Sequence, residues 1–482
     1  MTVVLGTRGD ITLEAVRRVA WGGEGVAIAP AALERIAACR ASFLKLIDAD
    51  PDLVIYGVTT AMGENARVRL SAAERTRHAR IKPFAAAASF GEPYPPRVVR
   101  AMILARLANF LDGHAATTPR IAQGVAAMLD GRPLPQVAQQ GQGGAGEILA
   151  LYPLFAELAA GLDLEVKERG SLINGSPCAA ALVADAALAA RARAGLAARV
   201  FALSIEAFRT PLEHYDAVLE SLWGDPHQAA ALQALRAALA GAAGEGRRNY
   251  QAPVSFRIVP RVLGQAYRAL AQAEEAATTA LAAASDNPVY VPPDADHPLG
   301  RCLSTGGYHD AAAAPALDAL AGAWADLCLL ADRHASKLLS GRVSGLPDLL
   351  LVGRDPADAD GHGALGYVPM AIIGYAEEAR AAATRTFIPG SESAGAGQDD
   401  VAAPAFLAWP KEARAGRALD AALAGLAAVA SQALHVTGRA APPPLAPLLA
   451  TVRAHVPPVE ADRVLGPELR RLADAFTAQV FA

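Results

Sequence analysis

The sequence predicts an all-α protein built around a long central helical bundle. The chain has 482 residues, of which 53% are hydrophobic and only 5% aromatic, so alanine, leucine and valine must supply most of the core. Alanine is the strongest helix former, and Ala-rich helices can pack closely. Two long runs of this composition, Ala311–Leu339 and Lys411–Gly438, are expected to form the backbone of the bundle.

Charge and cysteine content narrow the class of protein. The net charge of −4 gives no reason to expect nucleic acid or an acidic membrane surface as a partner. The N-terminal Met1–Asp10 does not resemble a signal peptide, and the longest apolar run near the C-terminal side, Ala421–Ala430, is too short to span a bilayer. We therefore expect a cytoplasmic protein with reduced thiols at its four cysteines, Cys39, Cys178, Cys302 and Cys328.

The N-terminal part is expected to contain two helices and then a loop. Asp10–Gly22 begins with Thr12 as a helix N-cap, and Pro30–Ile47 carries its apolar residues on one face. Leu53–Gly63 is rich in β-branched residues and ends in glycine, which indicates a loop. Tyr56 in this loop could face a ligand or form a half-buried lid, and its position in the loop leaves both open.

A glycine-dense loop, residues 139–146, leads into an apolar helix expected at 147–162. Gly143 and Gly144 allow backbone or ligand to come very close, and the N-terminal amides of the helix would point back at the loop. Glu147 suits the positive end of the helix dipole. The stretch is therefore either a tight turn before a helix or the centre of an active site.

Polar residues in the next helices suggest both structural and binding roles. Arg106 and Asn109 lie on one face of a helix at 97–112 and are expected to satisfy each other or a loop backbone. In the segment 166–187, the charged run Lys167–Arg169 precedes Asn174, which could form a turn or hold a ligand. Arg257 lies in an apolar stretch and needs an anionic partner from the protein or from a substrate.

The second half of the chain is expected to be mostly bundle. A helix of about 20 residues should follow Leu263 and stop at Ser285–Pro288. The segment 341–410 is rich in glycine, proline and acids and is expected to form covering loops. We expect an N-terminal region at 1–200 with the active-site loops, and the bundle at 201–482 with a C-terminal helical appendage.

Eight stretches, in this order, resemble those of the aromatic amino-acid ammonia-lyases and aminomutases, the group that contains histidine and phenylalanine ammonia-lyase. They are Tyr56–Thr60, Gly91–Pro93, Arg106–Asn109, Leu172–Gly175, Ser255–Arg257, Ser285–Pro288, Ser304–His309 and Gln398–Asp400. The resemblance covers nearly the whole chain. It implies a helical homotetramer whose active sites are assembled from several subunits, and chemistry of elimination or addition next to a carboxylate.

The glycine loop departs from the family. There, an Ala-Ser-Gly triad cyclises into a methylidene-imidazolone electrophile, and the triad falls here on Ala145, Gly146 and Glu147. Gly146 has no hydroxyl to eliminate, so the group cannot form by that route and no cofactor is expected. No metal-binding motif is present either. Further departures fall at Ala85–Ala86, in place of a Ser-His pair, at Val254, in place of tyrosine, and at Asp399, in place of glutamate.

Other positions of the family's site are retained. By resemblance, Tyr56 is the acid/base and needs a lowered pKa, Arg257 binds the substrate carboxylate, and Asn174 lies beside the prosthetic group. These residues suggest an enzyme that uses the scaffold without the electrophile, for elimination, conjugate addition or cyclisation on a small carboxylate. Additional expected site residues are Glu147, as a second acid/base or only a helix charge, and Gly144, Tyr308 and Asp399.

Two alternatives stay open. The chain could be a non-catalytic carboxylate-binding or scaffold protein of the same fold. It could also be an ordinary ammonia-lyase, if the alignment of the glycine loop is wrong. The residues do not identify the substrate.

Overall fold

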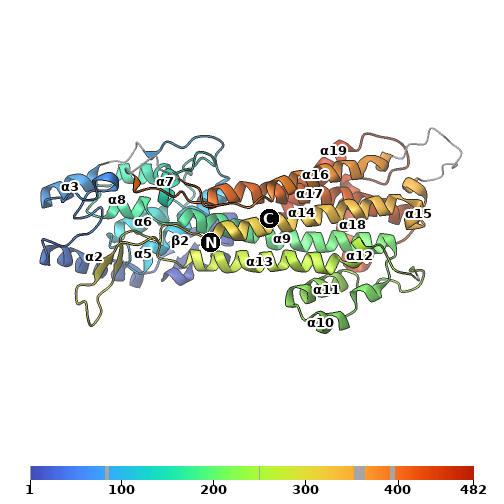
Figure 1. Cartoon of the computed structure of the whole chain (residues 1–482), viewed down its shortest axis with the longest axis horizontal. Helices are drawn as coiled ribbons and strands as arrows, with labels where there is room; N and C mark the ends of the chain where they lie inside the picture. The colour runs from blue at the N-terminus through green and yellow to red at the C-terminus, as the bar shows by residue number, and fades with distance from the viewer. Residues whose placement is uncertain (1, 82–85, 249, 352–363, 391–396, 482) are drawn as a thin grey trace. The chain divides into compact units, whose positions relative to one another are not determined.

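The computed structural model describes residues 2–81, 86–248, 250–351, 364–390 and 397–481 (Figure 1). Within these ranges the regular structure is almost entirely helical, which confirms the all-α prediction. The strands are short. Strand β1 (Thr2–Leu5) pairs in parallel with β2 (Gly25–Ile28), and β3 (Val289–Val291) pairs antiparallel with β4 (Arg301–Leu303).

The helices follow one another along the chain with short connections. They are α1 (Leu13–Val16), α2 (Pro30–Ala49), α3 (Ala72–Arg80), α4 (Pro96–Arg106), α5 (Ala108–Leu111), α6 (Pro119–Ala127), α7 (Ile148–Gly161), α8 (Glu168–Ile173), α9 (Pro177–Phe208), α10 (Val218–Trp223), α11 (Pro226–Ala238), α12 (Val254–Arg257), α13 (Val259–Leu281), α14 (Ala313–Leu339), α15 (Gly341–Ser344), α16 (Val368–Ala382), α17 (Ala405–Val436), α18 (Ala446–His455) and α19 (Gly466–Val480).

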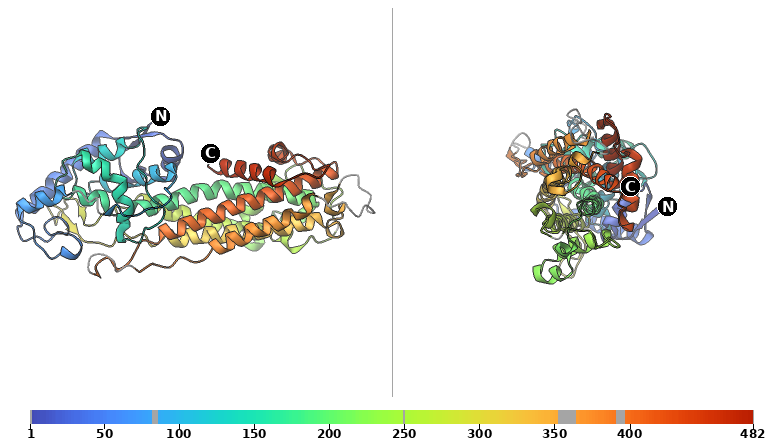
Figure 2. Two further views of the ribbon diagram at one scale, coloured as in Figure 1. Left: turned by 90° about the horizontal axis from the view of Figure 1, so that it is seen from above. Right: turned by 90° about the vertical axis from the view of Figure 1, so that its right-hand side faces the viewer.

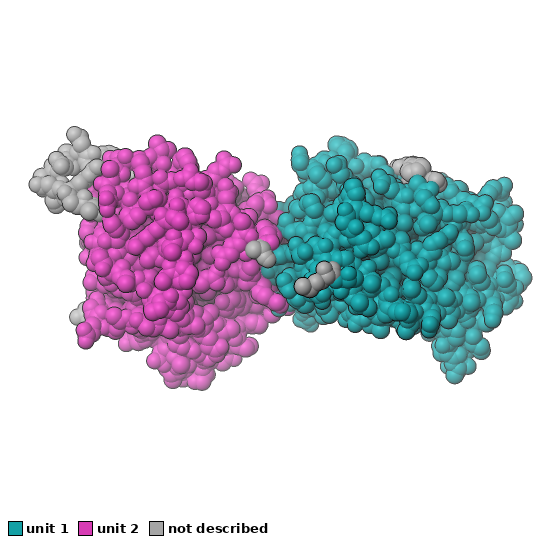
Figure 3. Space-filling view, turned by 180° about the vertical axis from the view of Figure 1, so that it is seen from behind, with its two compact units in different colours: residues 1–188, 273–317, 386–410 teal, residues 189–272, 318–385, 411–482 magenta. Residues whose placement is uncertain are grey.

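The chain divides into two compact units, coloured teal and magenta in Figure 3. Unit 1 comprises residues 1–188, 273–317 and 386–410, and unit 2 comprises 189–272, 318–385 and 411–482. Both units are discontinuous, whereas the sequence suggested one division at residue 200. The reason is that α9, α13, α14 and α17 each begin in one unit and end in the other.

Unit 2 is a bundle in which the long helices run side by side (Figures 1 and 2). Its core holds a buried charge network: the Arg193 guanidinium on α9 donates to Asp420 on α17 at 2.9 and 3.1 Å. Glu412 accepts a hydrogen bond from the Trp324 indole at 2.8 Å. Gly416 makes room for the network, because a Cβ there would lie 2.6 Å from the Arg193 guanidinium carbon.

Removing one partner of this buried pair should be strongly destabilising. Asp420→Ala leaves the Arg193 charge without its bidentate partner in a core where both residues are at most 1% exposed. We expect the free energy of unfolding to fall by about 3–5 kcal/mol. The matched control is Glu377→Ala, which removes an exposed partner of Arg380 and should cost less than about 1 kcal/mol. Denaturant titration measures both, and equal losses would contradict the prediction.

Unit 1 carries the loops that the sequence singled out. Thr12 caps α1, accepting from the Ala15 amide at 3.2 Å, as its position predicted. The fully buried Arg106 side chain on α4 donates to the backbone carbonyls of Asn174 and Ser171. Asn109 accepts from the Ser285 amide at 2.7 Å. The helix expected at 97–112 is broken at Leu107, so Arg106 ends α4 and Asn109 lies on α5. Both side chains bind backbone groups of other segments, which agrees with the structural role expected for them.

Two expectations about the second half of the chain need correction. The segment 341–410 contains the 15-residue helix α16, although its composition suggested only loops. Three helical stretches, Glu168–Phe208, Ala313–Leu339 and Ala405–Val436, are long and apolar enough to cross a membrane by length and composition. The expectation that the longest apolar run near the C-terminal side, Ala421–Ala430, is too short to span a bilayer was wrong, because this run lies within the helix Ala405–Val436. Between 61% and 94% of the apolar windows is buried within the protein, so their apolar character is used in helix packing.

Candidate active site

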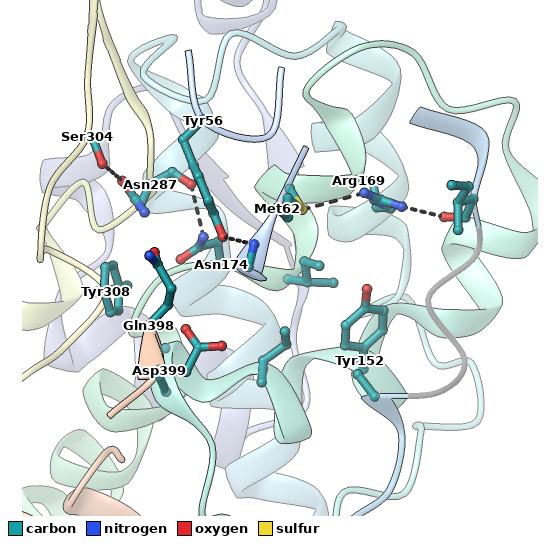
Figure 4. Close-up of a pocket in the computed structure, with 17 residues that line it drawn as sticks. Tyr56, Met62, Tyr152, Arg169, Asn174, Asn287, Ser304, Tyr308, Gln398 and Asp399 are labelled. Atoms are coloured by element: carbon teal, nitrogen blue, oxygen red, sulfur yellow. Dashed lines mark hydrogen bonds between the residues drawn. The ribbon is translucent and has the colours of Figure 1, made fainter. Parts of the chain in front are cut away.

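A pocket of about 570 Å³ lies in unit 1 and is drawn in Figure 4. Its volume lies within the range of small-molecule sites. Four of the predicted site residues line it: Tyr56, Asn174, Tyr308 and Asp399. The remaining lining residues are Met62, Gly63, Ile81, Ala86, Ala145, Gly146, Ile148, Tyr152, Arg169, Ile173, Asn287, Ser304 and Gln398.

Tyr56 projects from the loop before α3 toward Asn174 (Figure 4). Its hydroxyl oxygen accepts a hydrogen bond from the Gly63 amide at 2.9 Å. Burial raises the pKa of Tyr56, the negative charge of Asp399 raises it further, and the Gly63 amide opposes both. The lowered pKa expected from the sequence is therefore wrong for the single chain. Tyr56 is a neutral phenol here at physiological pH.

Asn174 stands at the end of α8, where the chain turns toward α9. Its side-chain amide donates to the backbone carbonyl of Asn287 at 2.9 Å. Asn287 is held in turn, because its side-chain oxygen accepts from the Thr305 amide at 2.9 Å. These contacts fix the Asn174 side chain at the pocket wall, close to the glycine loop.

The glycine loop enters the pocket through Ala145 and Gly146. Gly146 has φ +61°, a left-handed conformation that a residue with a side chain adopts only at a cost. A Cβ at this position would lie 3.2 Å from the Tyr308 ring and 3.6 Å from the Asn174 side-chain oxygen. The loop is thus closely packed against two other pocket residues. Helix α7 begins right after it, at Ile148, close to the predicted start.

These residues do not fit the family's electrophile. Formation of the methylidene-imidazolone needs a serine hydroxyl that can be lost as water, and Gly146 at that position has none. Glu147 stands where the triad has its glycine and is held by another helix.

Glu147 does not line the pocket, although the sequence made it a candidate acid/base. It is 1% exposed, and its carboxylate accepts from the backbone amides of Cys178 and Ala179 at 2.6 and 2.7 Å. These amides belong to the first turn of α9, so Glu147 caps a different helix from the one it precedes in sequence. Burial raises the pKa of Glu147 to about 8, while the two amides oppose the rise.

The raised pKa of Glu147 predicts a pH-dependent stability. Between about pH 4.5 and 8 the folded chain keeps a proton that the unfolded chain has released, so the free energy of unfolding falls as the pH rises. Glu147→Gln removes this titration. As the pH rises across that window, the free energy of unfolding of the variant should increase relative to that of the wild type by up to about 1.4 kcal/mol per pH unit.

Denaturant titration at pH 5, 6.5 and 8 measures this difference, and Glu157→Gln is the matched control because Glu157 is exposed on α7. If the free energy of unfolding changes with pH equally in the wild type and in Glu147→Gln, the raised pKa of Glu147 would be contradicted.

Two further predicted site residues also lie outside the pocket lining. Gly144 is half-buried within the glycine loop, where a Cβ would meet Ile148 at 3.1 Å. Arg257 ends α12 in unit 2, and its Nε donates to the Ala252 carbonyl at 3.0 Å. No described carboxylate forms an ion pair with Arg257. Its guanidinium is therefore available for an anion from outside the chain.

The sequence missed the other end of the pocket. Arg169 and Tyr152 line it opposite Tyr308 and Asp399, with Met62 between (Figure 4). Arg169 was noted only as part of a charged run, and Tyr152 was hidden in the apolar pattern of α7. Ala86, one of the two positions that replace a Ser-His pair, lines the pocket, while Ala85 lies outside the described residues.

The described residues were considered as possible ligands for a metal ion. Among the described residues, no group of three or more histidine, cysteine, aspartate or glutamate side chains is placed to bind one ion. All four cysteines carry free thiols.

Comparison with known proteins identifies the family. The chain matches the family model described as aromatic amino acid lyase over residues 11–161 and 155–456. It is 31% identical to a histidine ammonia-lyase of Deinococcus radiodurans over 374 residues, covering 71% of this chain and 69% of the relative. A histidine ammonia-lyase of Streptomyces avermitilis is 30% identical over 516 residues, covering 98% and 96%.

Among solved structures, the ergothioneine degrading enzyme ergothionase from Treponema denticola has a similar fold. It superposes with a TM-score of 0.88 at 19% identity, covering 100% of this chain and 99% of that chain. With the fold, the pocket and the family match in agreement, the chain belongs to the aromatic amino acid lyase family.

Proposed function

We propose that this protein catalyses β-elimination from a small carboxylate, or the reverse conjugate addition or cyclisation, without a methylidene-imidazolone group. The observation that carries the proposal is the lining of one pocket by Tyr56, Asn174 and Gly146. The acid/base and the amide of the family are kept, and the hydroxyl that makes the electrophile is missing.

In the elimination direction, Tyr56 acts in its deprotonated form: the phenolate oxygen takes a proton from the carbon next to the one that bears the leaving group and becomes the neutral phenol. The C–H electron pair becomes the second bond of the alkene, and the leaving group departs with the electrons of its own bond. The Asn174 amide supports the negative charge that builds up toward the substrate carboxylate. Addition and cyclisation are the same steps in reverse, with Tyr56 returning the proton.

A substrate of this kind needs a leaving group that departs without electrophilic activation. A quaternary ammonium meets the requirement because it leaves as a neutral tertiary amine. Asp399 and the Tyr308 ring lie together in the pocket and suit a cationic group. We therefore place the leaving nitrogen at Asp399 and Tyr308.

Arg257 is proposed to bind the carboxylate next to the reacting carbons, as a bidentate partner. Because it does not line the pocket formed by its own chain, we propose a homotetramer in which another subunit supplies it. Its positive charge would also lower the pKa of Tyr56 and make the phenol a better base.

Incubation of the purified protein with β-substituted and quaternary-ammonium carboxylates, followed by mass spectrometry, tests the proposal. Conversion to unsaturated acids supports it, and binding without conversion would favour the scaffold alternative. The intact mass of the same sample tests the cofactor separately. A mass equal to the sequence mass supports independence from the electrophile, whereas a deficit of two waters would show that the group forms.

A further inference from the structure

The charged run Lys167–Arg169 contains one residue whose charge is not compensated. Lys167 pairs with Asp286 at 2.7 Å, and Glu168 accepts from the Thr118 hydroxyl and amide at 2.6 and 3.0 Å. Arg169 is 8% exposed and forms no ion pair with any carboxylate among the described residues. A buried charge of this kind is costly, so the lack of a partner calls for an explanation.

The contacts that Arg169 does make are with uncharged groups. It donates to the Ile81 carbonyl at 3.2 Å, and its other terminal nitrogen lies 3.5 Å from the Met62 sulfur and 3.3 Å from the His78 ring. Its Nε is buried without any hydrogen-bond partner among the described atoms. Burial lowers the pKa of His78, so the neighbouring imidazole is neutral and does not compensate the charge.

Arg169 lines the pocket at the same end as Tyr152 (Figure 4). The Tyr152 side chain is 7% exposed, and its hydroxyl has no hydrogen-bond partner among the described residues. A guanidinium without a carboxylate partner and a phenol without a hydrogen-bond partner among the described residues thus line the same end of the pocket. An anion placed there would receive charge-assisted hydrogen bonds from both.

We infer that Arg169 and Tyr152 form a subsite for a second anionic group, so that the substrate is a dianion with a carboxylate or similar group at its non-reacting end. The reacting end lies by Tyr56 and Asn174, on the other side of Met62 (Figure 4). This inference rests on the proposed function for the position of that end. It adds the substrate class, which the family match does not give.

Matched pairs of unsaturated acids test the subsite by binding alone. Cinnamate and 4-carboxycinnamate differ by one distal carboxylate, as do crotonate and glutaconate, and the two pairs place that carboxylate at different distances. Titration calorimetry should show the wild type binding the dianion of at least one pair roughly tenfold to a hundredfold more tightly. Arg169→Gln should abolish the preference and leave binding of the monoanion unchanged.

Two more variants separate charge at the subsite from charge elsewhere. Arg169→Lys keeps the charge without the planar fork and should retain part of the preference. Arg80→Gln removes an exposed arginine that pairs with Asp163 at 3.0 Å and should retain all of it. Thermal melting checks folding: Arg169→Gln should melt no lower than the wild type, because a buried charge without a partner is removed.

Equal binding of both members of both pairs by the wild type would overturn the inference, and so would a preference that survives in Arg169→Gln. A melting temperature that falls in Arg169→Gln would show a structural role instead. These results are independent of the proposed reaction, because no turnover is measured. A protein that converts monoanionic acids without favouring dianions would refute only the subsite. A protein that favours dianions but converts none of the candidates would refute only the reaction.

Discussion

Replacing Tyr56 with phenylalanine is expected to lower kcat by about 10²–10⁴, the usual contribution of a positioned acid or base. The variant keeps the ring that lines the pocket and loses only the oxygen that accepts from the Gly63 amide. Substrate binding should change little, because the hydroxyl's partner in the free protein is this amide. Steady-state kinetics separates the two effects, with kcat falling and KM nearly unchanged.

The pH profile makes the test specific. The pKa of Tyr56 is raised by burial and by Asp399, so its base form is scarce at neutral pH. Wild-type kcat/KM in the elimination direction should therefore rise with pH through the alkaline range, and the residual activity of Tyr56→Phe should lack this rise. Tyr367→Phe, at an exposed tyrosine, is the matched control. Full turnover in Tyr56→Phe would remove the proposed base.

The composition and periodicity of the sequence were enough to predict the long helices of the bundle. They did not predict features that depend on contacts between residues distant in the sequence. Alanine-rich runs such as 311–339 became α14 because composition and periodicity act along the chain itself. Helix α16 was missed because glycine and proline on both sides hid its 15 residues.

The site shows the same division between local and spatial information. Tyr56, Asn174, Tyr308 and Asp399 were found by resemblance, and they line one pocket. The contact of Glu147 with the first turn of α9 joins residues 31 and 32 positions apart, which no pattern in the glycine loop indicates.

Arg169 was missed for a related reason. A charged run usually marks a solvated surface. Only the fold shows that this run is buried, with Lys167 paired to Asp286 and Glu168 to Arg120. The uncompensated charge of Arg169 can be recognised only when the partners of Lys167 and Glu168 are known from the structure.

Mixing two inactive variants should restore activity if the site is shared between subunits. Tyr56 lines the pocket of its own chain, whereas Arg257 does not. Tyr56→Phe chains still supply Arg257, and Arg257→Gln chains still supply Tyr56. In randomly mixed oligomers with equal amounts of the two chains, about a quarter of the sites would hold both intact residues, if each site takes them from different subunits.

Co-expression of the two variants with different affinity tags, tandem purification and a turnover assay measures this. The expected result is activity near a quarter of the wild type in the mixture, compared with a loss of about 10² or more in each variant alone.

Two mixtures serve as controls: Tyr56→Phe with itself, and Arg257→Gln with itself. Because a site built from one chain would never combine both intact residues, a mixture as inactive as its parents would show that Tyr56 and Arg257 do not meet across subunits. The carboxylate would then need another partner, and Arg169 is the one buried arginine of the described pocket lining that could take that place.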